Sequence, residues 1–127
     1  MSVTPALRFE DLPSAVELYT GPLGFTIASG AVDDGHVAVE RGGSRLMLEG
    51  KATFFGQEYN EAIASRLGTP SAGALYVEAD DLTELYDAVT AAGLSVVDPL
   101  ADRPWGQTEF TVEDSEGHWL SFWKRLA

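Results

Sequence analysis

The chain contains no cysteine among its 127 residues. Disulfide bonds, thiolate metal sites and cysteine nucleophiles are therefore excluded, and the absence agrees with a reducing compartment. Histidine is nearly as scarce, with two copies, at His36 and His118. Two scattered histidines rarely build a site, and each is more typical of a structural or solvated role. The sequence indicates neither a Ser-His-Asp arrangement nor a phosphate-binding loop.

Positive charge is scarce as well. Lysine and arginine together number 8 against 20 aspartates and glutamates, which gives a formal net charge of −12. Binding of nucleic acid requires a basic face, so we expect no nucleic-acid partner. An acidic cleft attracts a cationic ligand, but the net charge alone favours a simpler interpretation, in which the acids keep the protein soluble.

Long apolar runs are also absent. No segment approaches the roughly 20 apolar residues that cross a membrane, and the first residues, MSVTPALRFEDLP, lack the basic start and apolar run of a signal peptide. We therefore expect a cytoplasmic protein that has no membrane partner. The length fits one domain, and the hydrophobic fraction of 45% is ordinary for a globular core.

The chain does contain a faint internal repeat. Segment 9–25, FEDLPSAVELYTGPLGF, resembles segment 78–94, EADDLTELYDAVTAAGL. Each passes from an extended stretch through an Asp-Leu pair into a helical stretch with Glu-Leu-Tyr, and then reaches glycine and an apolar residue. A repeat of this length is too long for a solenoid, so it predicts two similar half-domains.

Hydrophobic periodicity and turn chemistry predict the same order of elements in both halves, strand, helix and three strands. The expected elements of the first half are a strand over 5–9, a helix from Pro13 to Gly24, and strands over 25–30, 36–41 and 45–50. Those of the second half are a strand over 74–79, a helix over 81–93, and strands over 94–99, 108–114 and 118–123. VDDG (32–35), GG (42–43) and DSEG (114–117) are predicted turns, and EYNEAIASRL (58–67) favours a short helix between the halves.

Two βαβββ copies in a chain of this size resemble the vicinal oxygen chelate superfamily. Segments 9–25 and 77–93 are similar to its two module motifs, and RPWGQTEFTVEDSEGHWLSF (103–122) is similar to its closing hairpin. The resemblance implies an α+β fold in which two βαβββ modules form a curled mixed sheet, in a homodimer. It implies a single domain over 1–127, with modules at about 1–50 and 72–127.

Enzymes of this superfamily hold one divalent ion with four side chains, usually His or Glu. Carried over residue by residue, the positions fall at Thr4, Glu49, Ala74 and Ser121. Only Glu49 has a plausible ligand, because hydroxyls are poor ligands for such metals and alanine has no donor atom. The direct neighbours of the other three positions have no coordinating side chains either, so a register error does not restore the site. We expect no metal and no other cofactor.

Side chains alternate along a strand, so residues two away from the metal positions share their face. That face then includes Ala6, Arg8, Arg45, Met47, Tyr76, Glu78, Trp119 and Trp123, while Leu120 and Phe122 belong to the core. Two of the three tryptophans thus lie where an enzyme keeps its metal, and Trp105 lies in the loop before the seventh strand. Such aromatic surfaces suit flat rings and cations.

The predicted ligand contacts come from this face, from its rim and from two loops. They are Trp105, Gly106, Trp119, Trp123, Met47, Glu49, Tyr76, Phe54, Phe55, Tyr59, Asp33 and Asp34. Aromatic residues in the connection at 53–60 are typical of a groove cover or an interface. Two alternatives stay open: Trp119 and Trp123 fill the face or pack against a second subunit, and Asp33 and Asp34 serve only as turn residues.

The Pro-Trp-Gly of the closing hairpin is similar to the bleomycin-resistance branch. This resemblance implies a metal-free homodimer that sequesters a cationic, aromatic-containing antibiotic in grooves between subunits, without catalysis, and confers resistance. Members often exchange their first strand, which here contains Pro5. One alternative is an enzyme (a glyoxalase or lyase, isomerase, dioxygenase or thiol transferase) that uses a metal, or Glu49 or Glu78 as general base. Another is a protein that acts through its dimer alone.

Overall fold

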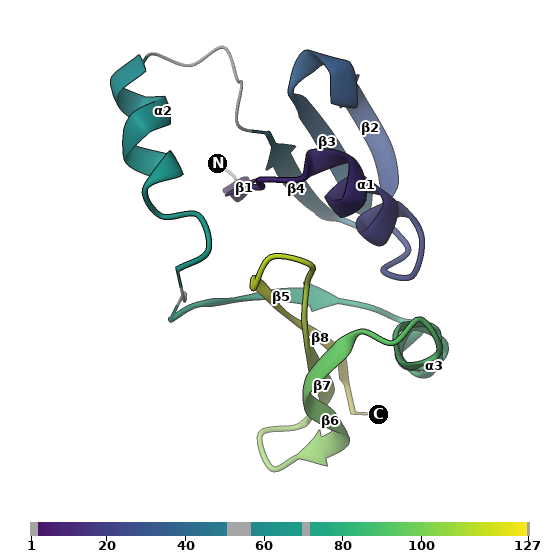
Figure 1. Cartoon of the computed structure of the whole chain (residues 1–127). Helices are drawn as coiled ribbons and strands as arrows, with labels where there is room; N and C mark the ends of the chain where they lie inside the picture. Colours follow the sequence, from purple (N-terminus) through teal and green to yellow (C-terminus); the bar gives the residue numbers. More distant parts are fainter. Residues whose placement is uncertain (1–2, 51–56, 70–71, 127) are drawn as a thin grey trace. The chain divides into compact units, whose positions relative to one another are not determined.

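The computed structural model describes residues 3–50, 57–69 and 72–126. The chain divides into two compact units, Met1–Thr69 and Pro70–Ala127, and each contains one four-stranded sheet (Figure 1). The predicted α+β fold with two βαβββ modules is confirmed, because both units follow the order strand, helix and three strands.

The first unit joins a mixed sheet to a helix that lies across one of its faces (Figure 1). Its sheet has the order β1-β4-β3-β2; β1 pairs with β4 in parallel, and the other pairs are antiparallel. The elements are β1 (Ala6–Arg8), α1 (Leu12–Thr20), β2 (Thr26–Ala31), the 3-10 turn η1 (Val32–Asp34), β3 (His36–Arg41), β4 (Ser44–Glu49) and α2 (Gln57–Ala64).

The second unit repeats this topology. Its sheet has the order β5-β8-β7-β6, with β5 parallel to β8 and the other pairs antiparallel. The elements are β5 (Ala74–Glu78), α3 (Leu82–Ala91), β6 (Ser95–Arg103), β7 (Gln107–Glu113) and β8 (Trp119–Arg125).

Helix α1 begins as predicted but ends earlier. The Asp11 carboxylate caps its first turn by accepting from the Ser14 backbone N–H at 3.2 Å and from the Ser14 hydroxyl at 2.8 Å. The prediction extended the helix to Gly24, but it ends at Thr20. Pro22 follows, and it has no amide hydrogen to continue the helical bonds.

Strand β6 is longer than predicted. It runs past Pro99 to Arg103, although the sequence favoured an end at that proline. Register shifts occur between Val96 and Asp98 and between Asp98 and Ala101. Because β6 lies at the edge of its sheet, a proline that cannot donate to the ladder is tolerated there.

The segment between the predicted modules contains a helix, as expected, although α2 ends at Ala64 and the pattern favoured residue 67. None of its residues is buried. Among the residues that the structure describes, no helix is long and apolar enough to span a membrane.

Each sheet packs its apolar core face beneath a helix of its own unit, α1 in the first and α3 in the second. In the first unit the Tyr19 ring meets Phe9 and Phe25 edge to face, with centroids 6.1 and 5.6 Å apart. In the second unit Phe110 meets Tyr86 of α3 at 4.9 Å and Phe122 at 5.5 Å. Leu120 and Phe122 are both fully buried, which confirms their predicted place in the core.

The turn between β7 and β8 depends on Asp114. Its Oδ1 accepts from the backbone N–H groups of Glu116 and His118, each at 2.9 Å, and its Oδ2 lies 2.8 Å from Nδ1 of His118. Burial raises the pKa of the Asp114 carboxyl, but the hydrogen bond and charge of His118 and the two amide donors outweigh it, so the pKa is lowered. His118 thus has the structural role that was favoured.

We predict that Asp114→Asn lowers the free energy of unfolding at pH 7 by about 1–3 kcal/mol, because it removes a buried carboxylate from three donors. A carboxyl whose folded pKa is depressed stabilises the fold above its unfolded pKa of about 4, and this contribution is lost as pH falls through its folded pKa. Urea unfolding at pH 7 and at about pH 3 measures the difference, which should shrink at the lower pH.

Asp33→Asn provides the matched control, because it removes the same charge from an exposed turn residue. It should change stability by less than about 0.5 kcal/mol at either pH. An equal loss for Asp114→Asn at both pH values would contradict the assigned role of its charge.

Candidate functional site

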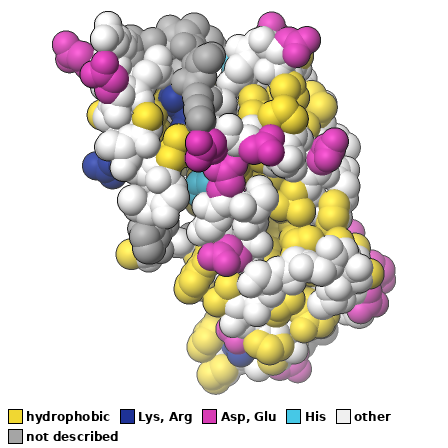
Figure 2. Space-filling view, in the orientation of Figure 1, with side chains coloured by type: hydrophobic (Ala, Val, Ile, Leu, Met, Phe, Trp, Pro, Cys, Tyr) yellow, Lys and Arg dark blue, Asp and Glu magenta, His cyan; other side chains and the backbone are white. Residues whose placement is uncertain are grey.

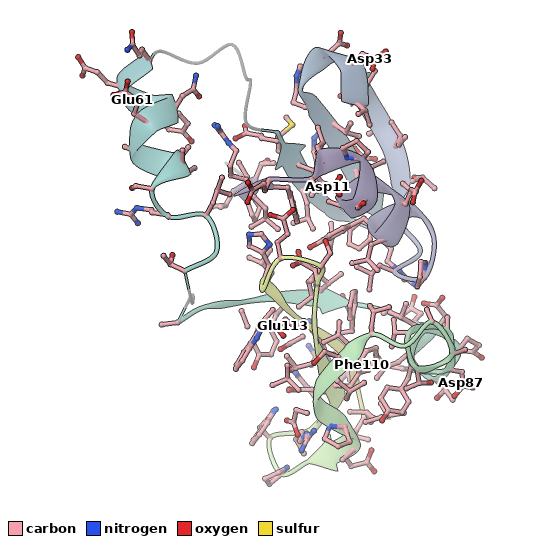
Figure 3. The ribbon with its side chains drawn as sticks, viewed as in Figure 1. Asp11, Asp33, Glu61, Asp87, Phe110 and Glu113 are labelled. Carbon is pink, nitrogen blue, oxygen red and sulfur yellow. The ribbon has the colours of Figure 1, made fainter. Side chains whose placement is uncertain are left out.

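The second sheet carries its aromatic residues on the face opposite its core. Register places Ala74 beside Trp119, Tyr76 beside Ser121 and Glu78 beside Trp123. We call this surface the aromatic face. Its residues on β5, β7 and β8 are Ala74, Tyr76, Glu78, Glu109, Thr111, Glu113, Trp119, Ser121 and Trp123. The predicted alternation is confirmed on these strands, and Phe110 and Glu113 lie on different sides of β7 (Figure 3).

A hollow of about 390 Å³ opens on the aromatic face. It is lined by Ala74, Tyr76, Val97, Asp98, Thr111, Trp119 and Ser121. Tyr76 is 61% exposed and Trp119 is 40% exposed, so Trp119 does not fill the hollow. Its volume is in the range of small-molecule sites.

The floor of the hollow is polar but internally satisfied. The hydroxyl groups of Thr111 and Ser121 lie 2.6 Å apart and form a hydrogen bond, which register across β7 and β8 brings together. Ser121 is 2% exposed. Because each hydroxyl has a hydroxyl partner, neither is paired with a base that would activate it as a nucleophile.

Two tryptophans of the second unit donate their indole N–H to carboxylates of β7. Trp105 donates to Oε1 of Glu109 at 2.5 Å, and Gln107 donates to the same oxygen at 2.8 Å. Trp119 donates to Oε1 of Glu113 at 3.3 Å. Both carboxylates therefore accept hydrogen bonds from neutral groups.

Trp105 lies in the turn between β6 and β7, as the sequence predicts, and is 64% exposed. Gly106 has a φ of 90°, a conformation that favours glycine, and its carbonyl accepts from the backbone N–H of Leu126 at 3.0 Å. Arg103 donates to the carbonyl of Pro99 at 2.7 Å and lies 3.1 Å from Asp98. The turn therefore holds Trp105 in place at one end of the β7–β8 pair, whereas Trp119 lies at the other end, opposite Glu113.

The first sheet presents a buried ion pair on the face opposite its core. Arg8 and Glu49 are register neighbours on β1 and β4, and their side chains, 3% and 5% exposed, approach to 3.5 Å. His36 lies across from Glu49 on β3. From α2, the Asn60 carbonyl oxygen accepts from Arg8 at 3.4 Å, and the Tyr59 ring centroid lies 5.7 Å from the guanidinium carbon.

The residues at the superfamily's metal positions do not fit a metal. Thr4 precedes β1 and is exposed, Ala74 offers no donor atom, and the Ser121 hydroxyl is bonded to Thr111. Glu49 has a suitable carboxylate, but Arg8 is its ion-pair partner. Within residues 3–50, 57–69 and 72–126, no group of three or more His, Cys, Asp or Glu residues is arranged to hold a metal ion.

The other predicted contacts are dispersed. Asp33 and Asp34 lie in η1 and are exposed, which agrees with turn residues and leaves their contact with a ligand a prediction. Met47 shares the Glu49 face of β4 and is partly buried. Trp123 is partly buried on the aromatic face. Phe54 and Phe55 lie outside the described residues.

Sequence reasoning missed two groups that organise these faces. Glu109 and Glu113 were not singled out, although alternation from Thr111 places all three on one face of β7. Asn60 was also missed, because nothing local in EYNEAIASRL indicates that it meets Arg8. The alternation of the hairpin strands would have revealed Glu109 and Glu113, but only the tertiary fold reveals the role of Asn60.

The geometry agrees with comparisons to known proteins. The model of the Glyoxalase/Bleomycin resistance protein/Dioxygenase superfamily matches residues 3–122. Among solved structures, TioX from Micromonospora sp. ML1 is 26% identical over 99% of each chain, with a TM-score of 0.73. A glyoxalase/bleomycin resistance protein/dioxygenase from Nocardioides is 25% identical, with a TM-score of 0.66 over 97% of this chain and 82% of that one.

A bleomycin resistance determinant encoded on the transposon Tn5 is 21% identical over 98% of each chain, with a TM-score of 0.66, and shares the fold. No curated protein matches the chain. The family match covers nearly the whole sequence and agrees with the paired βαβββ units. The chain therefore belongs to the glyoxalase/bleomycin resistance protein/dioxygenase superfamily.

Proposed function

We propose that the protein binds a flat, cationic small molecule on the aromatic face of its second unit and releases it chemically unchanged. A bleomycin-type antibiotic is the ligand class favoured by the resemblance of the closing hairpin, and sequestration would confer resistance. The observation that carries the proposal is the hollow between Tyr76 and Trp119, which combines exposed rings with nearby carboxylates.

The exposed rings supply the affinity. Stacking of aromatic groups contributes about 0.5–1.5 kcal/mol beyond the burial of their area, and Tyr76 and Trp119 both border the hollow. A volume of about 390 Å³ accommodates one ring system rather than a whole large antibiotic. The remainder of such a ligand would extend along the ladder, where Trp123 and Trp105 follow.

The carboxylates supply the preference for a cation. Glu113 lies at the edge of the hollow through its bond with Trp119. Asp98 also lines the hollow, but its charge is partly offset by Arg103 at 3.1 Å. A cation over an indole face gains further energy where the site is desolvated. The net charge of −12 adds a long-range attraction, and acidic side chains outnumber basic ones on the surface drawn in Figure 2.

Binding without catalysis fits these residues better than acid–base chemistry. Glu49, the first candidate base, is paired with Arg8. Glu78, the second, is exposed at the end of an edge strand, where water competes for any proton transfer. His118 is bonded to Asp114 in a turn.

We also propose that the functional form is a homodimer in which a second copy extends the groove. In the structure β1 pairs with β4 of its own chain, with Ala6 opposite Met47, so exchange of the first strand stays a prediction. Trp123 and Trp105 are the aromatic residues available to border a groove completed by the second copy.

We predict that metal-free bleomycin quenches the tryptophan fluorescence saturably, at about one molecule per chain. Trp119→Ala should weaken binding about tenfold or more, because it removes a ring that lines the hollow. Trp105→Ala is the comparison: it removes the same side chain from the turn between β6 and β7, which is not part of the lining of the hollow. Its loss should be smaller, because only the remainder of a large ligand would reach it.

Equal losses in both variants would move the site from the hollow to the turn. Quenching that does not saturate in the unmodified protein would sink the proposal for bleomycin. The same titration with mitomycin C then tests a second antibiotic class.

We further predict that Glu109 fixes the Trp105 ring before any ligand arrives. In a protein with Trp105 as its single tryptophan (Trp119→Phe, Trp123→Phe), Glu109→Leu should increase nanosecond motion of the indole, because the ring loses its acceptor. Time-resolved fluorescence anisotropy measures this motion. Glu113→Leu removes the other carboxylate of β7 that accepts from an indole in the unmodified protein, and it should leave the motion of Trp105 unchanged. Equal mobility in all three proteins would show that Glu109 does not hold the ring.

A further inference from the structure

The strongest unexplained feature outside the aromatic face is the Arg8–Glu49 pair. Both side chains are nearly inaccessible, at 3% and 5% exposure, yet their closest atoms are 3.5 Å apart. Burying charge is costly unless it is compensated. A pair in this position therefore needs a reason beyond surface solubility.

Arg8 is held from the other side by α2. Both terminal nitrogens of its guanidinium lie 3.4 Å from the Asn60 carbonyl oxygen, and the Tyr59 ring lies within cation–π distance at 5.7 Å. The guanidinium is thus bracketed by β4 on one side and α2 on the other. A planar cation held by an amide oxygen, a carboxylate and a ring is firmly placed.

Glu49 still has unused acceptor capacity. Its Oε1, the atom that faces Arg8, is buried and accepts no hydrogen bond from the described residues. His36 lies directly opposite on β3. Glu49 on β4 therefore lies between two register neighbours, the imidazole of His36 on β3 and the guanidinium of Arg8 on β1.

We propose that the Arg8 guanidinium takes the place of a metal ion on this face. The guanidinium neutralises Glu49 at the one superfamily metal position that has a ligand-type side chain, and its positive charge excludes a divalent ion from that carboxylate. The proposal concerns the first unit alone and does not depend on ligand binding in the second.

This assignment has a consequence that can be measured. Without Arg8, the Glu49 carboxylate would be buried with no compensating cation, and His36 would lie beside it as a second potential ligand. A divalent ion would then be attracted to the place that the guanidinium occupies. Loss of one cation should create a site for another.

We predict that Arg8→Met gains one Mn²⁺ site at least tenfold tighter than any site in the unmodified protein. Electron paramagnetic resonance of free Mn²⁺ during titration gives the stoichiometry and affinity. The gain should disappear in Arg8→Met/Glu49→Gln, because the carboxylate that attracts the ion is removed.

Arg45→Met is the matched control. It breaks the ion pair with Glu40 on the same sheet, at 2.7 Å, and changes the net charge equally, but both side chains there are 44% exposed. Water already solvates Glu40, so the gain in Mn²⁺ affinity should be less than about threefold.

Thermal unfolding keeps the proposal testable if Arg8→Met folds poorly. The single variant should lose roughly 10 °C in Tm because it leaves the buried Glu49 carboxylate without a compensating cation. Arg8→Met/Glu49→Gln should regain at least half of that loss. A double variant no more stable than the single one would overturn the proposal.

Two results of the Mn²⁺ titration would also overturn it. One is a Mn²⁺ site in the unmodified protein that weakens tenfold or more in Glu49→Gln. The other is an Arg8→Met protein that binds Mn²⁺ no better than Arg45→Met.

Discussion

Each four-stranded sheet of this protein packs the apolar side chains of one face beneath a helix of its own unit, α1 in the first and α3 in the second. Because side chains alternate along a strand, the choice of buried face decides what the other face presents. Leu120 and Phe122 are fully buried, and that burial forces Trp119, Ser121 and Trp123 to the opposite side. The same rule in the first unit places Leu48 in the core and Glu49 on the opposite face.

This constraint explains how much of the molecule can be predicted from its sequence. Alternation and turn residues identify nearly every strand, and they identify the face that carries Tyr76 and Trp119. Three features were not predictable in this way. The early end of α1 depends on Pro22, the extended β6 depends on its edge position, and the Arg8–Asn60 contact joins residues that are 52 apart in the chain. Local pattern carries no information about such a contact.

The two units compensate the carboxylates on the faces opposite their cores differently. In the first, a guanidinium balances Glu49, so that face has no net charge at this point. In the second, Glu109 accepts from an indole N–H and an amide, and Glu113 accepts from an indole N–H. Neutral donors satisfy hydrogen-bonding capacity without cancelling charge, so these bonds do not neutralise the two carboxylates in the way that Arg8 neutralises Glu49.

The same arrangement separates binding from catalysis. A general base needs a free lone pair aimed at the proton it removes, whereas a binding surface needs rigid rings and fixed charge. Glu109 and Glu113 each accept an indole N–H through Oε1, and these bonds help to fix the positions of the Trp105 and Trp119 rings. Fixing the rings in advance lowers the entropy lost on association. In the binding proposed for the aromatic face, its carboxylates would therefore contribute through the tryptophans that they position as well as through their own charge.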